Sequence, residues 1–139
     1  MNRPGRIFPV FALALMAASV LCCVRPSSFE SFVPVHKASD GVYVFDFEMS
    51  DTLSTYDFEF FTRIDGERPD SLPLRVMWLA PSGKSFSETV YMNPGLDVEK
   101  YRSGVAPAEQ GRWRICVRPA VESPGFRGLG LVCKTNGTR

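Results

Sequence analysis

Two adjacent cysteines, Cys22 and Cys23, follow an uncharged, largely apolar run from Val10 to Leu21. A cysteine at the end of such a run is the lipid acceptor of bacterial lipoproteins, whose signal peptidase cuts just before it. The run is shorter than the ~20 apolar residues that span a bilayer. With Arg3 and Arg6 ahead of it, it has the pattern of a secretion signal. The sequence therefore predicts acylation, for example with palmitate, at this point of the chain.

Cys23 fits the lipid acceptor better than Cys22 does. A cut before Cys23 places Val20 and Leu21 in the apolar positions and Cys22 in the small position, whereas a cut before Cys22 would put bulky Leu21 in the small position. Two or more acyl chains on Cys23 would anchor the protein stably. The alternative is cleavage at a small-residue site within Ala14 to Ser19, which would release a soluble secreted protein.

Four segments follow from this reading. We expect a signal peptide at residues 1–22, the lipidated cysteine and a tether at 23–40, one folded domain at 41–134, and a disordered tail at 135–139. The length of 139 residues suits a single domain. The 16 Lys and Arg residues nearly balance the 15 Asp and Glu residues, and no basic stripe stands out, which argues against nucleic-acid binding.

No catalytic arrangement emerges. His36 is the only histidine, it lies in the expected tether, and no Gly-x-Ser-x-Gly turn accompanies it, so a His-assisted hydrolase and a His-based metal site are both disfavoured. Asp57 and Glu59 would suit a glycosidase pair. They share an outward phase with the arginines of the 112–118 segment, however, and we expect cross-strand ion pairs instead. The sequence predicts no enzyme, no cofactor and no metal.

Period-two alternation past residue 40 predicts an all-β fold. Aromatic and β-branched residues alternate with polar ones, as in strands buried on one face, and turn signals such as Asp65-Gly66 and Pro124-Gly125 separate the runs. The expected strands are Tyr43 to Met49, Tyr56 to Ile64, Leu74 to Trp78, Ser85 to Tyr91, Arg112 to Arg118 and Arg127 to Lys134. This pattern predicts a single antiparallel β-sandwich, Ig-like or jelly-roll-like.

The connection from Met92 to Gly111 is unusually long, so it is either functional or holds a small extra element. A single helical turn near Asp97 to Tyr101 is the simpler expectation. If the connection binds a partner protein, Tyr and Arg are the common interface anchors. The partner-binding residues that we expect are Glu99, Tyr101, Arg102 and, before the last strand, Arg127.

Several apolar residues allow two readings. Trp78 and Trp113 share phase with aliphatic neighbours, which predicts core packing, although exposed tryptophans would form sugar-stacking platforms. Phe61, Met77 and Leu79 have the outward phase. They form either a protein-binding patch on adjacent strands or a surface covered by the apolar segment from Phe29 to Val35.

The phases of the last two cysteines differ. Cys116 alternates opposite to its apolar neighbours, whereas Cys133 shares their phase, so the two thiols face different sides unless a bulge resets one strand. Two free thiols are therefore expected, although an exported domain can hold a disulfide.

An ordered set of short motifs between residues 42 and 133 resembles the gliding-motility (GldH-like) lipoprotein family of the Bacteroidetes. The motifs are Thr55-Tyr56-Asp57, Phe60, Arg63, Leu72-Pro73-Leu74, Pro81-Ser82-Gly83-Lys84, Glu88-Thr89-Val90-Tyr91, Gly111-x-Trp113-x-Ile115 and Gly125-Phe126-Arg127-Gly128-Leu129-Gly130-Leu131. The chain departs from the family between Met92 and Pro107, where family members have a Gly- and Trp-containing segment.

The resemblance implies a non-enzymatic envelope lipoprotein with an all-β domain, which acts through contacts with another envelope protein. A glycan-binding module of an anchored polysaccharide-handling system is the alternative. Thr52 and Ser71 lie in Asp-Ser/Thr-apolar tripeptides that look like the O-glycan acceptors of these bacteria, although such tripeptides also arise by chance. No acidic run follows Cys23, which favours an outer-membrane anchor with the domain facing the periplasm.

Overall fold

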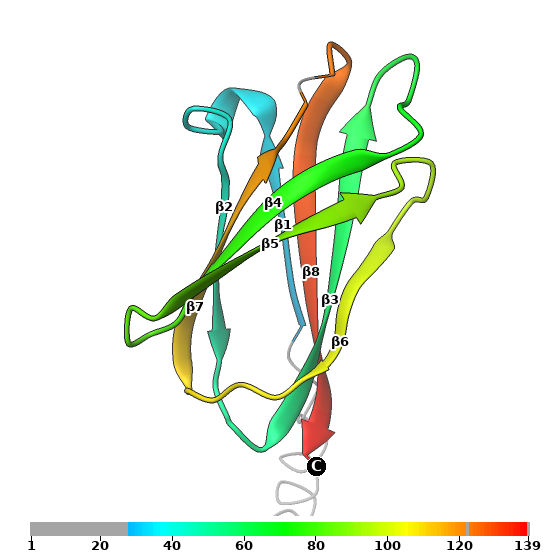
Figure 1. Cartoon of the computed structure of the whole chain (residues 1–139). Coiled ribbons are helices and arrows are strands. Elements are labelled where there is room, and N and C mark those ends of the chain that lie inside the picture. The colour runs from blue at the N-terminus through cyan, green and yellow to red at the C-terminus, as the bar shows by residue number, and fades with distance from the viewer. Residues whose placement is uncertain (1–27, 122, 139) are drawn as a thin grey trace, which may run out of the picture.

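The computed structural model describes residues 28–121 and 123–138. Within these residues the chain forms eight strands and one short 3-10 helix, η1 (Figure 1). Their bounds in chain order are β1 Ser28–Pro34, η1 Val35–Lys37, β2 Tyr43–Met49, β3 Ser54–Ile64, β4 Leu72–Leu79, β5 Ser85–Met92, β6 Glu99–Val105, β7 Gly111–Pro119 and β8 Phe126–Thr138. The predicted signal peptide and Cys23 lie outside the described residues.

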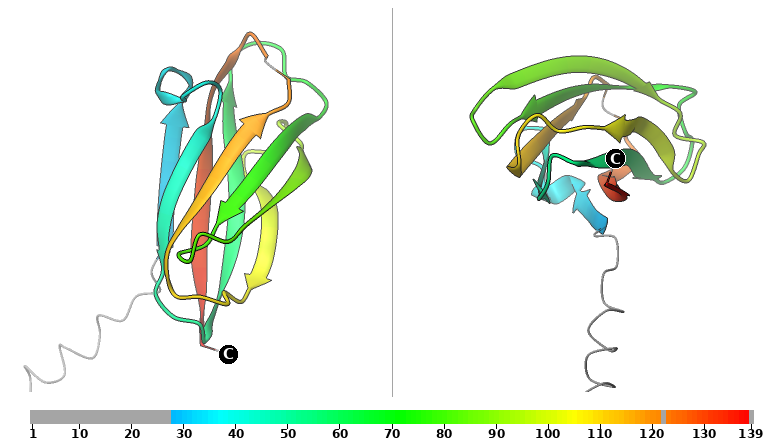
Figure 2. Two further views of the ribbon diagram at one scale, coloured as in Figure 1. Left: turned by 60° about the vertical axis from the view of Figure 1, so that its left-hand side comes forward. Right: turned by 90° about the horizontal axis from the view of Figure 1, so that it is seen from below.

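The strands form two four-stranded antiparallel sheets, in the orders β1-β8-β3-β6 and β2-β7-β4-β5. The first strand pairs with the last, the second with the seventh, the third with the sixth and the fourth with the fifth. This nesting is the strand order of a jelly roll. The predicted all-β sandwich is confirmed, and the two sheets lie face to face as two layers (Figure 2).

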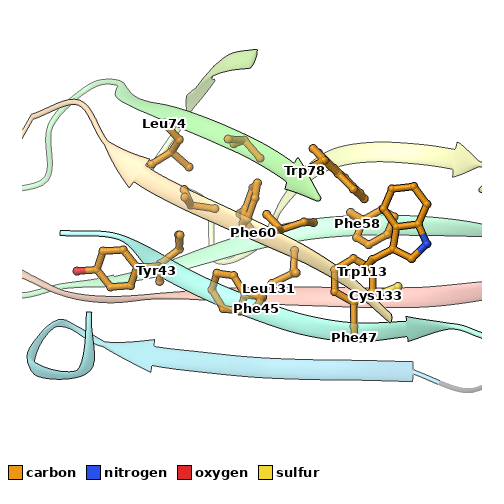
Figure 3. Close-up of a cluster of buried hydrophobic side chains, with 14 of the residues drawn as sticks. Tyr43, Phe45, Phe47, Phe58, Phe60, Leu74, Trp78, Trp113, Leu131 and Cys133 are labelled. Carbon is orange, nitrogen blue, oxygen red and sulfur yellow. The ribbon is translucent and has the colours of Figure 1, made fainter. Parts of the chain in front are cut away.

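The core fills the space between the sheets. Alternate side chains of β2, β3, β4 and β7 point inward, as the alternation in the sequence predicted. Trp78 and Trp113 are 2% and 8% exposed, so both belong to the core and neither can serve as a surface platform for a sugar. Figure 3 shows these two rings among the buried aromatic and aliphatic side chains.

Two strands were not predicted. Ser28–Pro34 lies within the predicted tether, but it forms β1 at the edge of one sheet and pairs with β8 from Ser28↔Lys134 to Pro34↔Gly128. The helical turn expected near Asp97 to Tyr101 is also wrong, because Glu99–Val105 forms β6. Both are edge strands, which bury few side chains, so neither segment carries a long alternating pattern. In β6 the pattern is further interrupted, because its pairing with β3 contains two register shifts.

The expected disordered tail at 135–139 is wrong for most of its length. Strand β8 continues to Thr138 because it has a partner on each side: β1 up to Lys134, and β3 up to Thr138. The folded domain therefore begins before residue 41 and ends after residue 134. Residue 139 lies outside the described residues.

Two glycines of β8, Gly128 and Gly130, leave room for a pair of stacked aromatic rings on the outer surface of the sheet. Phe32 and Phe61 both lie opposite Gly130, one from each neighbouring strand, and their rings stack with centroids 5.9 Å apart. A Cβ atom at Gly130 would lie 2.0 Å from the Phe61 ring. The N-terminal segment thus covers Phe61, as one of the two readings predicted, but by joining the sheet as a strand.

The loop before β8 touches the loop after β3. The amide of Asp65 donates a hydrogen bond of 2.8 Å to the carbonyl oxygen of Gly125. A Cβ atom at position 125 would lie 1.9 Å from the carbonyl oxygen of Asp65, which is backbone and cannot swing aside. Glycine is therefore required at position 125, because the backbone of the loop after β3 approaches it too closely for any side chain.

Gly125→Ala is expected to destabilise the domain, because the two loops must separate to admit the methyl group. We expect a loss of about 1–3 kcal/mol in the free energy of unfolding, as for other overpacked sites, measured by urea denaturation. Gly95→Ala is the control, since a Cβ there meets only the flexible Asn93 side chain, at 3.1 Å. Equal losses in the two variants would contradict the close-approach argument.

Candidate functional site

Tyr101 and Arg102, two of the residues expected to bind a partner, lie where the edge strands β5 and β6 close one side of the sandwich. The Tyr101 hydroxyl accepts a hydrogen bond of 2.8 Å from Trp78 Nε1 and donates one to Glu88. Arg102 binds the same carboxylate through two nitrogens, at 3.0 and 2.7 Å. The Tyr101 ring also stacks on Phe60, with centroids 4.8 Å apart.

Electrostatics in this cluster follow from its partial burial. Burial and the hydrogen bond to Glu88 together raise the pKa of Tyr101 to about 12. Burial also tends to raise the pKa of Glu88, but the hydrogen bonds from Tyr101 and Arg102 outweigh it and leave this pKa below its usual value. The phenol therefore stays protonated, and the carboxylate stays ionised, across the physiological range.

These contacts indicate a structural role for Tyr101. Its hydroxyl satisfies the buried indole N–H of Trp78, and its ring extends the core. Glu99 belongs to the same edge, where its carboxylate accepts a hydrogen bond from the backbone amide of Asn93. Of Glu99, Tyr101 and Arg102, the three expected partner-binding residues on this edge, Arg102 is the exposed one, with 41% of its side chain accessible.

Arg127 lies apart from this cluster, at one end of the sandwich. It forms a 2.6 Å ion pair with Asp65 in which both side chains are mostly exposed. Such pairs contribute little to stability. Arg127 also lines a pocket of about 580 Å³ between the β1–β2 and β7–β8 connections, which Tyr43 and Arg118 line as well. The structure therefore does not bring the four expected residues together into one site.

The two O-glycan positions lie in connections between strands, as expected. Thr52 is partly exposed, two residues before β3, and Ser71 is exposed, directly before β4. The carboxylate of Asp51, beside Thr52, accepts hydrogen bonds from Ser54 Oγ at 2.7 Å and from the Ser54 amide at 2.9 Å. The acidic residue of this tripeptide therefore caps the start of β3, a structural use that needs no glycan.

The outward side of the β2-β7-β4-β5 sheet carries a different set of residues, which we call the arginine face. Cross-strand register arranges it in rows. One row joins Arg118 of β7 with Arg75 of β4, and the next joins Cys116 with Met77. The arginine face comprises Val44, Asp46, Glu48, Arg75, Met77, Leu79, Ser85, Ser87, Thr89, Tyr91, Arg112, Arg114, Cys116 and Arg118.

The arginine face is positively charged, because four arginines stand against two carboxylates. Within the described residues, Arg114 is the one arginine of this face that forms an ion pair: it binds Asp46 through two bonds, of 2.7 and 3.0 Å. That hydrogen-bonded pair holds the pKa of Asp46 below its usual value despite partial burial. An excess of two positive charges therefore remains on one exposed sheet surface.

The outward side of the other sheet is balanced. Its charged residues are Glu30, Asp57, Glu59, Arg63, Lys100 and Lys134. Lys134 pairs with Glu59 at 3.2 Å. The cross-strand ion pairs expected between Asp57 or Glu59 and the arginines of β7 are wrong, because these carboxylates and these arginines lie on opposite outer faces of the sandwich.

The same separation of the two outer faces divides the apolar patch that was expected from Phe61, Met77 and Leu79. Phe61 belongs to the balanced face, whereas Met77 and Leu79 lie on the arginine face, so the three residues do not form one patch. Besides Met77 and Leu79, the arginine face carries two exposed residues of this kind: Tyr91 is 72% exposed and Val44 is 39% exposed. Tyr, Met and Arg are the residue types that protein interfaces favour, and Lys is absent from these rows.

The two cysteines lie on different sides of their strands, as predicted, and both are free thiols. Cys133 is buried in the core, where burial raises its pKa to about 12. Cys116 is partly exposed in the middle of the arginine face, and partial burial raises its pKa as well. Neither thiol is activated as a nucleophile.

Within residues 28–121 and 123–138, no three His, Cys, Asp or Glu side chains gather closely enough to hold a metal ion. His36 is exposed on η1. No helix in this part of the chain is long and apolar enough to cross a membrane.

Fold and surface together define a jelly-roll sandwich with one charged, partly apolar sheet face as its candidate binding surface. In comparisons with known proteins, no family model matches the chain, and no curated protein matches it either. Membership of the gliding-motility lipoprotein family therefore stays a prediction from the motifs.

Tyr101→Phe is expected to lower the free energy of unfolding by about 1–3 kcal/mol, because it leaves the buried Trp78 N–H without its acceptor. Urea denaturation followed by tryptophan fluorescence measures this loss. Tyr91→Phe removes the same atom from an exposed residue and should change stability by less than about 0.5 kcal/mol. If both variants matched the parent, the hydroxyl would not link the two sheets.

Proposed function

We propose that this protein is a non-enzymatic lipoprotein of the bacterial cell envelope, which acts by binding another envelope protein through the arginine face. The observation that carries the proposal is the excess of arginines on that face, next to exposed Tyr91 and Val44, while the opposite face is internally balanced. Exposed surface of this composition on one side of a small domain is typical of a protein contact.

The N-terminal sequence supports the anchor. The segment from Cys23 to Ser28 spans at most about 18 Å even when fully extended. Acyl chains on Cys23 would therefore hold the domain close to the membrane. Ser28 lies at the end of the sandwich where β8 finishes. The opposite end, with η1 and the β7–β8 connection, would then point away from the membrane (Figure 1).

The structure removes the residues on which the alternative of a glycan-binding module depended. It depended on Trp78 or Trp113 lying at the surface, and both are buried. Lectins are among the proteins that use jelly rolls, but a fold shared by many activities does not select one of them.

A role in gliding motility is a narrower proposal, and the motif resemblance supports it. The region that departs from the family pattern holds β6 and the residues of the β5–β6 edge. We therefore expect any motility partner to contact the arginine face and not this edge.

Cys23→Ala is expected to abolish lipid attachment, because the acceptor thiol is lost. Expression of the full chain in a bacterium fed with radiolabelled palmitate, followed by separation of membranes, measures both incorporation and membrane retention. Cys22→Ala is the matched control and should keep both, since alanine is an ordinary residue before the cut. Label on the Cys23→Ala protein would instead assign the lipid to Cys22.

A partner should be recoverable by crosslinking the lipidated protein in intact cells, followed by purification and mass spectrometry. Ser87→Glu places a negative charge in the middle of the arginine face and is expected to reduce recovery at least fivefold. Thr55→Glu makes the corresponding change on the balanced face and should leave recovery unchanged. Recovery of the lipoprotein alone, from wild-type cells, would overturn the proposed function.

A further inference from the structure

Arg75 and Arg118 share a small pocket on the arginine face. They lie directly opposite each other in the register of β4 and β7. Both line a pocket of about 340 Å³ whose other lining residues are Val42, Met77, Ser87 and Cys116. We call this the Arg75–Arg118 pocket. Residues directly opposite in an antiparallel pair have Cβ atoms about 4.5–5.5 Å apart, so the two side chains start as close neighbours.

No carboxylate lines this pocket. Within the described residues, the ion pairs involve the basic residues Arg102, Arg114, Arg127 and Lys134, and neither Arg75 nor Arg118. Like charges directly opposite each other destabilise a sheet, so the position is unfavourable unless an anion joins it. A carboxylate matches this need, because guanidinium groups bind its two oxygens in parallel.

The remaining walls of the pocket are apolar or carry a hydroxyl. Val42, Met77 and Cys116 provide the apolar surface, and Ser87 provides a hydrogen-bonding group. The row of Cys116 and Met77 follows the arginine row by two residues along each strand, a step of about 6.6 Å. An extended peptide spaces its alternate side chains by the same step, so an acidic side chain and an apolar one can occupy the two rows together.

The pocket also lies far from the expected anchor. Arg118 is next to the last residue of β7, which ends beside the start of β2 and therefore at the end of the sandwich opposite Ser28. An anion in this position is more readily supplied by a partner protein than by lipid headgroups of the anchoring membrane. We propose that the Arg75–Arg118 pocket binds a carboxylate side chain of an acidic, extended segment of the partner protein, an inference that rests on the proposed function.

Fluorescein-labelled hexaglutamate is a direct probe of the pocket. Fluorescence anisotropy with the mature, lipidated protein in nonionic detergent is expected to give saturable binding. The double variant Arg75→Gln/Arg118→Gln should weaken this binding at least tenfold. Hexaglutamate should also slow the alkylation of Cys116 by iodoacetamide, because this thiol lines the pocket, while Cys133 stays protected by the core in both conditions.

The matched control removes two positive charges from the balanced face, in Arg63→Gln/Lys134→Gln. Binding in this variant should stay within twofold of wild type. An equal loss in the two double variants would reduce the effect to general charge attraction and overturn the proposal. Glycerophosphate, a lipid headgroup without acyl chains, forms a second arm, because vesicles would hold the lipidated protein through its own acyl chains. If glycerophosphate slows the alkylation of Cys116 while hexaglutamate does not, the pocket binds lipid phosphate and the proposal is again wrong.

Crosslinking in cells separates this inference from the proposed function. If a partner is recovered with wild type and equally with Arg75→Gln/Arg118→Gln, the pocket proposal fails while the proposed function stands. If hexaglutamate binds in the pocket but wild-type cells yield no partner, the proposed function fails and the acidic-protein ligand fails with it. Loss of the partner in the arginine variant alone supports both.

Discussion

The rest of the structure depends on the ring of Trp78. From near the C-terminal end of β4 it contacts five aromatic rings on five other strands, Phe47, Phe58, Phe86, Tyr101 and Trp113, at centroid distances of 4.9–6.2 Å. Three of these contacts are edge-to-face, the arrangement that aromatic quadrupoles favour. The indole N–H meets the Tyr101 hydroxyl, so this residue joins both sheets at their closing edge as well as at their centre. The two layers have little freedom to slide while it is in place.

A core of this kind leaves function to the outer surfaces, and the two surfaces differ. The face of β1, β8, β3 and β6 carries equal numbers of acidic and basic residues and stacks Phe32 on Phe61 over Gly130. The face of β2, β7, β4 and β5 keeps two arginines opposed without a carboxylate. The two outer faces of the sandwich therefore differ in charge, and the proposed partner would supply the counter-charge that the arginine face lacks.

Alternation in the sequence was sufficient to predict six of the eight strands and the burial of Trp78 and Trp113. Period two separates inward from outward residues, but it does not say to which sheet a strand belongs. Asp57 and Arg114 therefore had the same outward phase and lie on opposite surfaces. Edge strands were missed for a related reason: β6 buries little and is interrupted by bulges, so the signal was present only at Tyr101 and Val105.

The nested strand order also sets when the domain can fold. Its first strand, beside the expected anchor, pairs only with its last strand, and Ser28 meets Lys134 across nearly the whole chain. Contacts this distant in sequence close slowly, because the loop entropy is lost before the pairing is gained. If the chain is exported as proposed, the pairing of β1 with β8 can be completed only after β8 has crossed the membrane. Such late closure would leave the polypeptide unfolded enough to pass through a translocation channel before its first and last strands pair.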